Sequence, residues 1–122
     1  MTGEPASPLG TTLRVGTVRA CAPNPKARTP AFVLEIDLGP HGMRTSSAQL
    51  TARYDADELV GRQVVVAMDL GTRLVAGVKS EVLVLGVGMG VETGLETGPA
   101  DESNGIVLLG PDARVPDGTL VH

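Results

Sequence analysis

Aromatic residues are almost missing from this sequence, which has one Phe, one Tyr and no Trp among its 122 residues. A hydrophobic core must therefore be built from Val, Leu, Ile, Ala and Met. Stacking of bases on aromatic side chains commonly contributes ~1–3 kcal/mol per base in proteins that bind single strands. The shortage of aromatics thus argues against a protein that holds nucleic acid mainly by stacking.

Cysteine and histidine are also scarce. The chain has a single cysteine, Cys21, and two histidines, His41 and His122. The metal-binding spacings Cys-x-x-Cys and His-Glu-x-x-His do not occur, so we expect no metal site. A lone cysteine cannot form an internal disulfide, which fits a reducing, cytoplasmic setting.

Motifs of hydrolytic and nucleotide-dependent enzymes are missing as well. Ser46 does not lie in a Gly-x-Ser-x-Gly elbow, and the sequence contains no Gly-Lys dipeptide of a P-loop. The run Gly86–Gly90 begins like a dinucleotide fingerprint, but Val91 stands where the third glycine would be required. We therefore expect no catalytic residues, no cofactor and no enzyme activity.

Long apolar runs and a strong positive charge are absent too. No stretch of 18 apolar residues occurs, so no transmembrane helix is expected, and the first ten residues lack the features of a signal peptide. Residues 1–80 hold nine Lys/Arg and seven Asp/Glu, a net of +2, whereas residues 81–122 hold one Arg and seven acids, a net of -6. The total of -4 does not fit a strongly basic nucleic-acid binder.

What the sequence does have in quantity is glycine and proline, sixteen and nine residues, which favours short strands joined by turns. The turn at 39–42 predicts antiparallel pairing of its flanking strands, and Asp55 with Glu58 predicts a capping box for a short helix at 55–60. Strands are predicted at 13–22, 32–38, 43–50, 63–70, 80–85 and 106–109. The pattern matches an all-β, five-stranded OB-fold barrel with a short helix and a C-terminal extension.

Other segments are predicted to lie outside the regular strands. Residues 1–12 should form a flexible lead, and 86–105 a mobile, acidic, glycine-rich insertion within an OB domain that spans 13–122. Residues 71–79 read as a connection with a bend, and Gly16 as a bend or bulge within its strand.

The stretch 43–50 is unusually polar for a barrel strand. Alternation along the strand places Arg44, Ser46, Ala48 and Leu50 on one face, and Thr45, Ser47 and Gln49 on the other. We expect the first face to be a mixed basic and apolar surface and the second to be a row of hydroxyl and amide groups.

Four segments resemble a known family: LRVGTVRACAPNPKARTPAFVLEIDLG (13–39), RTSSAQLTARYDADELVGRQVVVAMDL (44–70), RLVAGVKSEVLVLG (73–86) and IVLLGPDARVPDGTLV (106–121). They are similar to the CsaA-type export-related chaperones of the tRNA-binding-domain (OB-fold) family. Ser46-Ser47-Ala48-Gln49 favours the chaperone branch over the tRNA-binding one. The resemblance implies an ATP-independent, cytoplasmic homodimer that binds unfolded presecretory polypeptides and interacts with the export machinery. Structure-specific tRNA binding is the alternative.

OB barrels usually bind ligands on the face of their second and third strands. We predict a groove there for peptide or tRNA, with Phe32 supplying apolar area and cationic side chains supplying donors. Its members are Phe32, Arg44, Ser46, Gln49, Arg53, Arg73, Lys79, Ser80 and Glu81. Two structural alternatives remain open: Phe32 as a simple core residue, and Ser80 and Glu81 as hydrogen-bond partners of the 46–49 strand alone.

The C-terminal tail carries apolar residues among its prolines and glycines. Val115, Leu120 and Val121 need a surface to pack on, and the family resemblance implies that this surface belongs to a second copy of the chain. Packing of the tail on its own barrel is the alternative.

Overall fold

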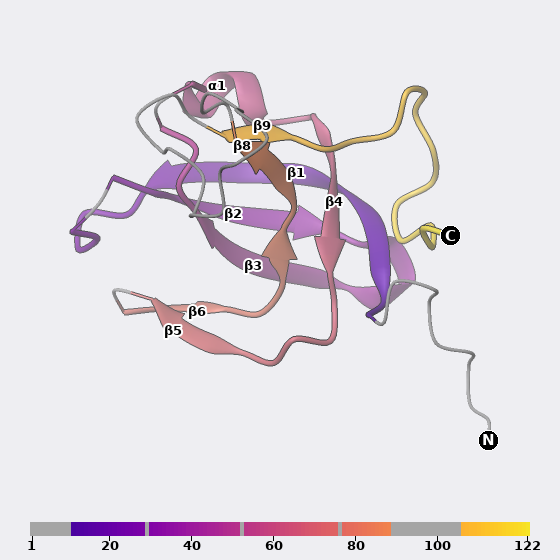
Figure 1. Ribbon diagram of the computed structural model, residues 1–122, viewed down its shortest axis with the longest axis horizontal. Helices are drawn as coiled ribbons and strands as arrows, with labels where there is room; N and C mark the ends of the chain where they lie inside the picture. Colours follow the sequence, from indigo (N-terminus) through magenta and orange to yellow (C-terminus); the bar gives the residue numbers. More distant parts are fainter. Residues whose placement is uncertain (1–10, 29, 52, 76, 89–105) are drawn as a thin grey trace, which may run out of the picture.

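The computed structural model describes residues 11–28, 30–51, 53–75, 77–88 and 106–122. Its main feature is a five-stranded antiparallel sheet in the order β3-β2-β1-β4-β7, which curls until it nearly closes into a barrel (Figure 1). The predicted all-β OB-fold class is therefore confirmed. Within the described ranges, no helix is long and apolar enough to cross a membrane.

The first three strands are β1 (Leu13–Pro23), β2 (Phe32–Asp37) and β3 (Met43–Ala48). β2 pairs antiparallel with both neighbours, and the short 3-10 helix η1 (Gly39–His41) forms the turn into β3. The predicted turn and the predicted antiparallel pairing are thus confirmed. Gly39 and Gly42 have positive φ angles of 60° and 84°, which explains why glycine flanks the Pro-His pair.

The core lies inside the curl of the sheet. Leu34 and Ile36 alternate with the exposed Glu35 along β2, as a strand with one buried face requires. Apolar residues from the helix and the other strands complete this core, including Val18, Leu50, Leu59, Val64 and Val66. Cys21 packs against its edge as a small apolar residue. Its partial burial raises the pKa of the thiol.

Gly16 differs from the prediction. The irregularity of β1 lies between Val18 and Ala20, where the register with β2 shifts. At Gly16 a Cβ atom would lie 2.6 Å from Ile36 Cγ2 and 2.7 Å from Leu38 Cδ2. This glycine therefore permits close packing of two strands rather than a bend.

The helix α1 (Ala56–Leu59) joins β3 to β4 (Gln63–Ala67). Its capping box is present as predicted: the backbone N–H of Asp55 donates to Glu58 Oε1 at 2.7 Å, and the Asp55 side chain accepts from the Glu58 backbone. Gly61, with a φ angle of 91°, follows the helix and adopts a backbone conformation that ends it. Leu59 seals the core from this end.

The second half of the chain contains short strands: β5 (Arg73–Val75), β6 (Val78–Ser80), β7 (Leu83–Val84), β8 (Gly86–Gly88) and β9 (Ile106–Leu108). β5 and β6 form a hairpin where a bent connection was predicted. β8 and β9 form a second hairpin, so the start of the predicted insertion is a strand. The rest of that insertion, 89–105, lies outside the described residues, as does most of the predicted N-terminal lead.

Candidate functional site

The barrel has a seam, the gap between its two edge strands β3 and β7. The strands are joined across it near one end only. The backbone N–H of Glu81 donates to Thr45 O at 2.7 Å, and the N–H of Val82 lies 3.4 Å from the same oxygen. Beyond Thr45 no strand pairing connects the described residues of β3 and β7.

The Lys79-Ser80-Glu81 motif reinforces this closed end. Glu81 Oε1 accepts the backbone N–H of Thr45 at 3.0 Å. Ser80 Oγ accepts the backbone N–H of Ser47 at 3.0 Å and donates to Val82 O at 3.3 Å. Both side chains therefore bond the edge of β3, as the structural alternative for Ser80 and Glu81 expects.

Two hollows flank Leu83 on the outside of the seam. The hairpin hollow, about 110 Å³, is lined by Leu70, Gly71, Arg73, Ser80, Val82 and Leu83. The seam hollow, about 260 Å³, is lined by Ser47, Ala48, Gln49, Leu50, Leu83, Val84, Gly86 and Ile106. Leu83 borders both, and 47% of its surface is exposed.

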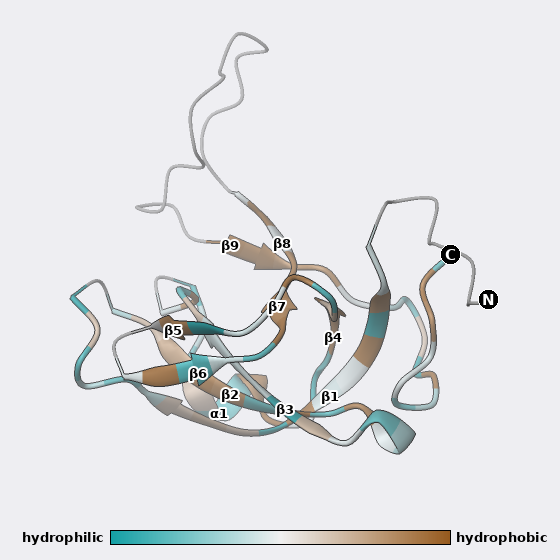
Figure 2. Ribbon diagram, turned by 90° about the horizontal axis from the view of Figure 1, so that it is seen from below, coloured by the Kyte–Doolittle hydropathy of each residue, from teal (hydrophilic) through white to brown (hydrophobic). Residues whose placement is uncertain are grey.

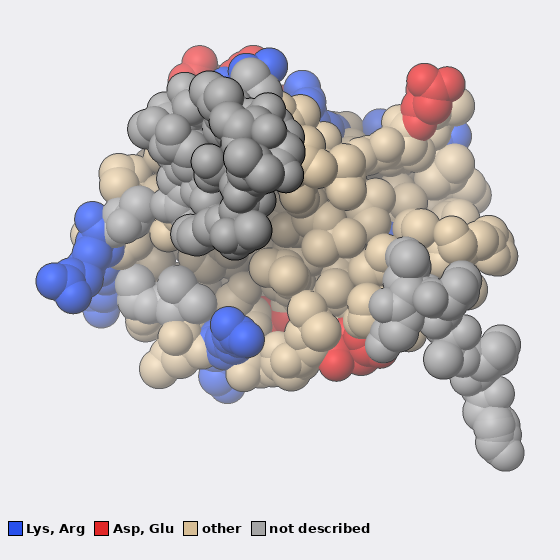
Figure 3. Space-filling model, viewed as in Figure 1, with Lys and Arg blue, Asp and Glu red and all other residues tan. Residues whose placement is uncertain are grey.

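The exposure of Leu83 differs from what its sequence context predicts. An uninterrupted apolar run predicts a strand buried on both faces, but β7 is only two residues long and lies at the sheet edge. Its outward side chain therefore has no second layer to cover it. Figure 3 shows a broad uncharged area on the face of the molecule toward the viewer, with Lys and Arg side chains at its left and lower left and Asp or Glu side chains at its lower edge.

Two predicted groove residues lie in the core instead. Phe32 is 6% exposed and Ser46 is 0% exposed. Ser46 pairs with Leu34 and Ala48 with Phe32, so this face of β3 follows the buried face of β2. The expectation of a mixed basic and apolar surface on that face was wrong, because Leu50 (2% exposed) and Ser46 turn inward together. For Phe32, the core alternative is the one the structure supports.

The remaining predicted residues are only partly brought together. Arg73 and Ser80 are paired across the β5–β6 hairpin, and both line the hairpin hollow. Gln49 lines the seam hollow. Lys79 is exposed and pairs with Leu74 on the other face of the hairpin. Arg44 is half-buried on β3 and Arg53 is exposed after it, and neither belongs to the lining of the hairpin hollow or the seam hollow.

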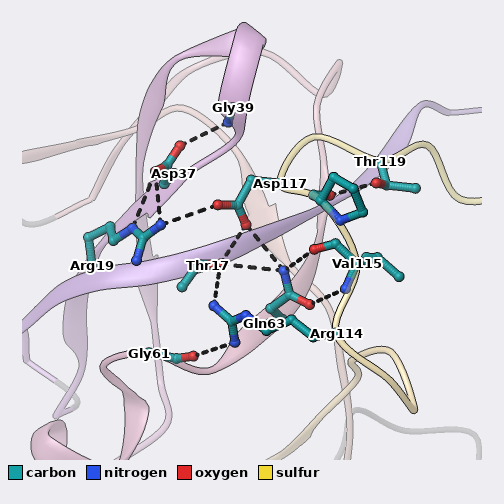
Figure 4. A network of polar contacts seen from close by, with 11 residues as sticks. Thr17, Arg19, Asp37, Gly39, Gly61, Gln63, Arg114, Val115, Asp117 and Thr119 are labelled. Atoms are coloured by element: carbon teal, nitrogen blue, oxygen red, sulfur yellow. Dashed lines mark hydrogen bonds and ion pairs between the residues drawn. The ribbon is translucent and has the colours of Figure 1, made fainter.

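A buried polar network lies at another part of the barrel, where the C-terminal tail packs (Figure 4). Gln63 Nε2 donates to Val115 O at 2.7 Å and to Asp117 Oδ1 at 3.2 Å, and Gln63 Oε1 accepts the N–H of Val115 at 3.0 Å. Thr17 Oγ1 donates to Asp117 Oδ1 at 2.5 Å. The prediction missed this network, although a glutamine at the head of the apolar run Val64–Ala67 was a signal for it.

Charged side chains extend the network to the surface. Arg19 bridges Asp37 at 3.2 Å and Asp117 at 3.3 Å. The backbone N–H of Gly39, followed by Arg19, holds the pKa of Asp37 below its usual value. Arg114 donates to Gly61 O at 3.2 Å and to Thr17 Oγ1 at 3.3 Å. Arg19, through Asp117, and Arg114, through Gly61 and Thr17, thus help to hold the tail on the barrel.

The tail also pairs with β1 through its backbone. The N–H of Val121 donates to Leu13 O at 2.8 Å, the N–H of Val15 to Thr119 O at 2.9 Å, and the N–H of Gly118 to Val15 O at 2.7 Å. Val115, Leu120 and Val121, predicted for a dimer interface, therefore belong to a segment that packs on its own barrel. Leu120 keeps 38% of its surface exposed.

A third hollow, about 340 Å³, lies between the tail and the end of α1 and is lined by residues 61–63 and 108–114. Its two arginines are already in contact with protein groups, since Arg62 lies 5.1 Å from the centre of the Tyr54 ring and Arg114 bonds Gly61. Within the described part of the chain, no group of three His, Cys, Asp or Glu side chains could hold a metal ion.

Several known proteins are similar to this chain. Residues 13–119 match the family described as "Putative tRNA binding domain". The chain is 35% identical over 96 residues to the methionine–tRNA ligase of Leptospira biflexa, and it spans only 14% of that protein's length.

Two solved structures cover nearly the whole chain. The chaperone CsaA of Bacillus anthracis is 41% identical, with a TM-score of 0.77 and 93% of both chains covered. The CsaA chaperone protein of Picrophilus torridus is 29% identical, with a TM-score of 0.76 and 92% of both covered. The chain therefore belongs to the tRNA-binding-domain family and, within it, is a protein of the CsaA type.

Proposed function

We propose that this protein is an ATP-independent chaperone that binds unfolded presecretory polypeptides at the two hollows beside Leu83. The observation that carries the proposal is a half-exposed leucine between two hollows whose linings contain one charged residue, Arg73. Burying a leucine-sized side chain contributes about 1.5–3 kcal/mol. A surface of this kind gains affinity from apolar segments that a folded client would keep inside.

The chemistry of the site is that of binding rather than catalysis. Arg73 offers hydrogen-bond donors at the rim of the hairpin hollow, where they can reach carbonyl oxygens or a carboxylate of the bound chain. The polar side chains of the neighbouring motif, Ser80 and Glu81, are already bonded to β3. These bonds hold the rim of the hairpin hollow in position.

The second candidate is structure-specific tRNA binding. It is favoured by the family match over residues 13–119 and by the likeness to methionine–tRNA ligases. Arg44, Arg53 and Lys79 would serve as phosphate contacts in that case. The net charge of -4 and the two aromatic residues make such binding the weaker candidate.

One titration separates the two candidates. The full chain is titrated against a fluorescently labelled unfolded presecretory polypeptide and against bulk tRNA, each at two salt concentrations. We expect saturable polypeptide binding with a weak dependence on salt, because the contacts are mainly apolar. Tight tRNA binding with a steep salt slope and no polypeptide binding would overturn the proposal.

The CsaA likeness also supports a homodimer acting in the cytoplasm beside the export machinery. Leu120, at 38% exposure, is a tail residue with apolar surface to offer a partner. Light scattering at low concentration should give twice the mass of the 12.5 kDa chain. Leu120→Asp should lower that mass if the tail lies in the interface, and a purely monomeric wild-type protein would contradict the dimer.

A further inference from the structure

The hairpin hollow combines an apolar lining with one guanidinium group, that of Arg73. Its apolar lining consists of Leu70, Val82 and Leu83. Arg73 lies opposite Ser80 across the β5–β6 hairpin, so the two side chains leave the hairpin on the same face. The Ser80 hydroxyl reaches the N–H of Ser47 on β3 from that face. The Arg73 side chain therefore lies on the side of the hairpin that turns toward the barrel and the hollow.

The guanidinium of Arg73 has no partner of its own among the described residues. The residue is exposed, and its side chain forms no ion pair and no hydrogen bond with any of them. Glu81, the acid of the neighbouring motif, accepts the N–H of Thr45 instead. An unpaired guanidinium beside an apolar hollow suits a carboxylate, which it can bind through two parallel hydrogen bonds.

Two further cations add positive charge around the hairpin. Lys79 is exposed on the other face of β6. Lys26, in the loop after β1, lies at the hairpin tip, where its Nζ is 3.9 Å from the position of a Cβ atom built on Gly77. Among the described residues, no acidic side chain lines the hairpin hollow or the seam hollow. These charges favour a bound segment that is negative over one that is positive.

We propose that the hairpin hollow takes one aliphatic side chain of the client polypeptide, while Arg73 pairs with an Asp or Glu side chain within the next three residues of the same segment. The inference deepens the proposed function and rests on it. Apolar segments that carry an acid are bound, and those flanked by Lys or Arg are disfavoured. Because a signal peptide begins with a positively charged region, the site should hold the mature part of a presecretory polypeptide and leave the signal peptide free.

The first test changes one charge on the peptide and leaves the protein intact. Labelled apolar peptides carry a leucine followed by Glu, Gln or Lys at one of the next three positions, and both peptide ends are blocked so that they are uncharged. Binding to the full chain is measured by fluorescence anisotropy. At the best position, we expect the Glu peptide to bind about threefold to fivefold more tightly than the Gln peptide, as a partly exposed ion pair allows, and about tenfold more tightly than the Lys peptide.

The second test changes the charge on the protein. Arg73→Gln should bind the Glu and Gln peptides within about twofold of each other, and Arg73→Glu should bind the Lys peptide at least threefold more tightly than the Glu peptide. Arg28→Glu is the matched control, because it makes the same change of charge at an exposed loop residue that lines neither hollow. It should keep the wild-type preference for Glu. Circular dichroism checks that each variant is folded.

The outcomes are distinguishable. Equal binding of the Glu, Gln and Lys peptides by the wild type, or a preference for Glu that survives in Arg73→Gln, would overturn the pairing with Arg73 and leave the proposed function intact. A preference that appears only for a peptide ending in a free carboxylate after the leucine would also overturn it, because Arg73 would then recognise a chain end. If the wild type binds none of the peptides, the proposed function fails and the pairing with it.

Discussion

Two strand edges of this barrel differ in whether their backbone groups have hydrogen-bond partners. The edge of β1 at Leu13–Gly16 is not covered by β2, whose pairing begins at Thr17. The chain's own tail covers it, through backbone hydrogen bonds to Leu13 and Val15. The seam edge of β7, by contrast, has no partner beyond Val82 among the described residues. Figure 2 shows the two regions at different places on the barrel, with the tail beside β1 and β7 beside the β5–β6 hairpin.

The side chains follow the same division. At the β1 edge Thr17, Gln63, Asp117 and Arg114 form a closed set of hydrogen bonds. At the seam the hollows are lined mainly by apolar side chains around the half-exposed Leu83. A fully paired edge stabilises the fold. An unpaired apolar edge makes a protein prone to aggregation, so such an edge is expected where a binding partner uses it. Substitutions at the two edges should therefore separate stability from binding.

The largest expected effect is at the tail edge. Gln63→Ala removes three bonds to Val115 and Asp117 and leaves the Val115 backbone without partners. We expect the free energy of unfolding to fall by about 2–4 kcal/mol in urea titrations, because each unsatisfied group adds to the lost bonds. The folded fraction should bind peptide as the wild type does. A loss below about 0.5 kcal/mol would show that the network does not hold the tail.

A smaller effect is expected at the closed end of the seam. Ser80→Ala leaves the half-buried N–H of Ser47 without its acceptor, which should lower the free energy of unfolding by about 1 kcal/mol. Ser80→Thr retains the hydroxyl and is the matched control. If both variants unfold like the wild type, the hydroxyl does not fasten β3 to the hairpin.

The smallest expected effect is on the stability of the fold at acidic pH. The pKa of Asp37 is lowered in the folded state, mainly by the Gly39 N–H and then by Arg19. A depressed carboxyl pKa stabilises the fold above the unfolded value of about 3.9 and loses that contribution as the pH falls through the folded pKa. Asp37→Asn should therefore flatten the fall in melting temperature below about pH 4. The pKa of Asp69 is lowered as well, mainly by the Thr11 hydroxyl, so part of the slope should remain. An unchanged profile would contradict the role of Asp37.

Local patterns predicted the fold well. The strand predicted at 32–38 was found as β2, the Asp55 and Glu58 spacing located α1, and both were confirmed. The β5–β6 hairpin was missed because Gly71 and Gly77 dominate a short apolar stretch that lacks clear alternation. Which face of β3 turned inward could not be read from 43–50 alone, since it depends on register with Leu34 and Ile36.

The site was harder to predict for a physical reason. Lys79-Ser80-Glu81 stands out in the sequence, yet Ser80 and Glu81 bond the β3 edge. Leu83 gives no signal, because an exposed leucine and a buried one look alike within an apolar run. Only the edge position of β7 exposes it.

The most direct test of the account compares Leu83→Ser with Leu109→Ser, a leucine of similar exposure (41%) in the hollow beside the tail. Both are titrated with the labelled unfolded presecretory polypeptide. The account predicts that Leu83→Ser weakens binding by about tenfold or more, as expected for losing about 1.5–3 kcal/mol of apolar burial, while Leu109→Ser binds within about twofold of the wild type. Equal binding by the two folded variants would contradict it.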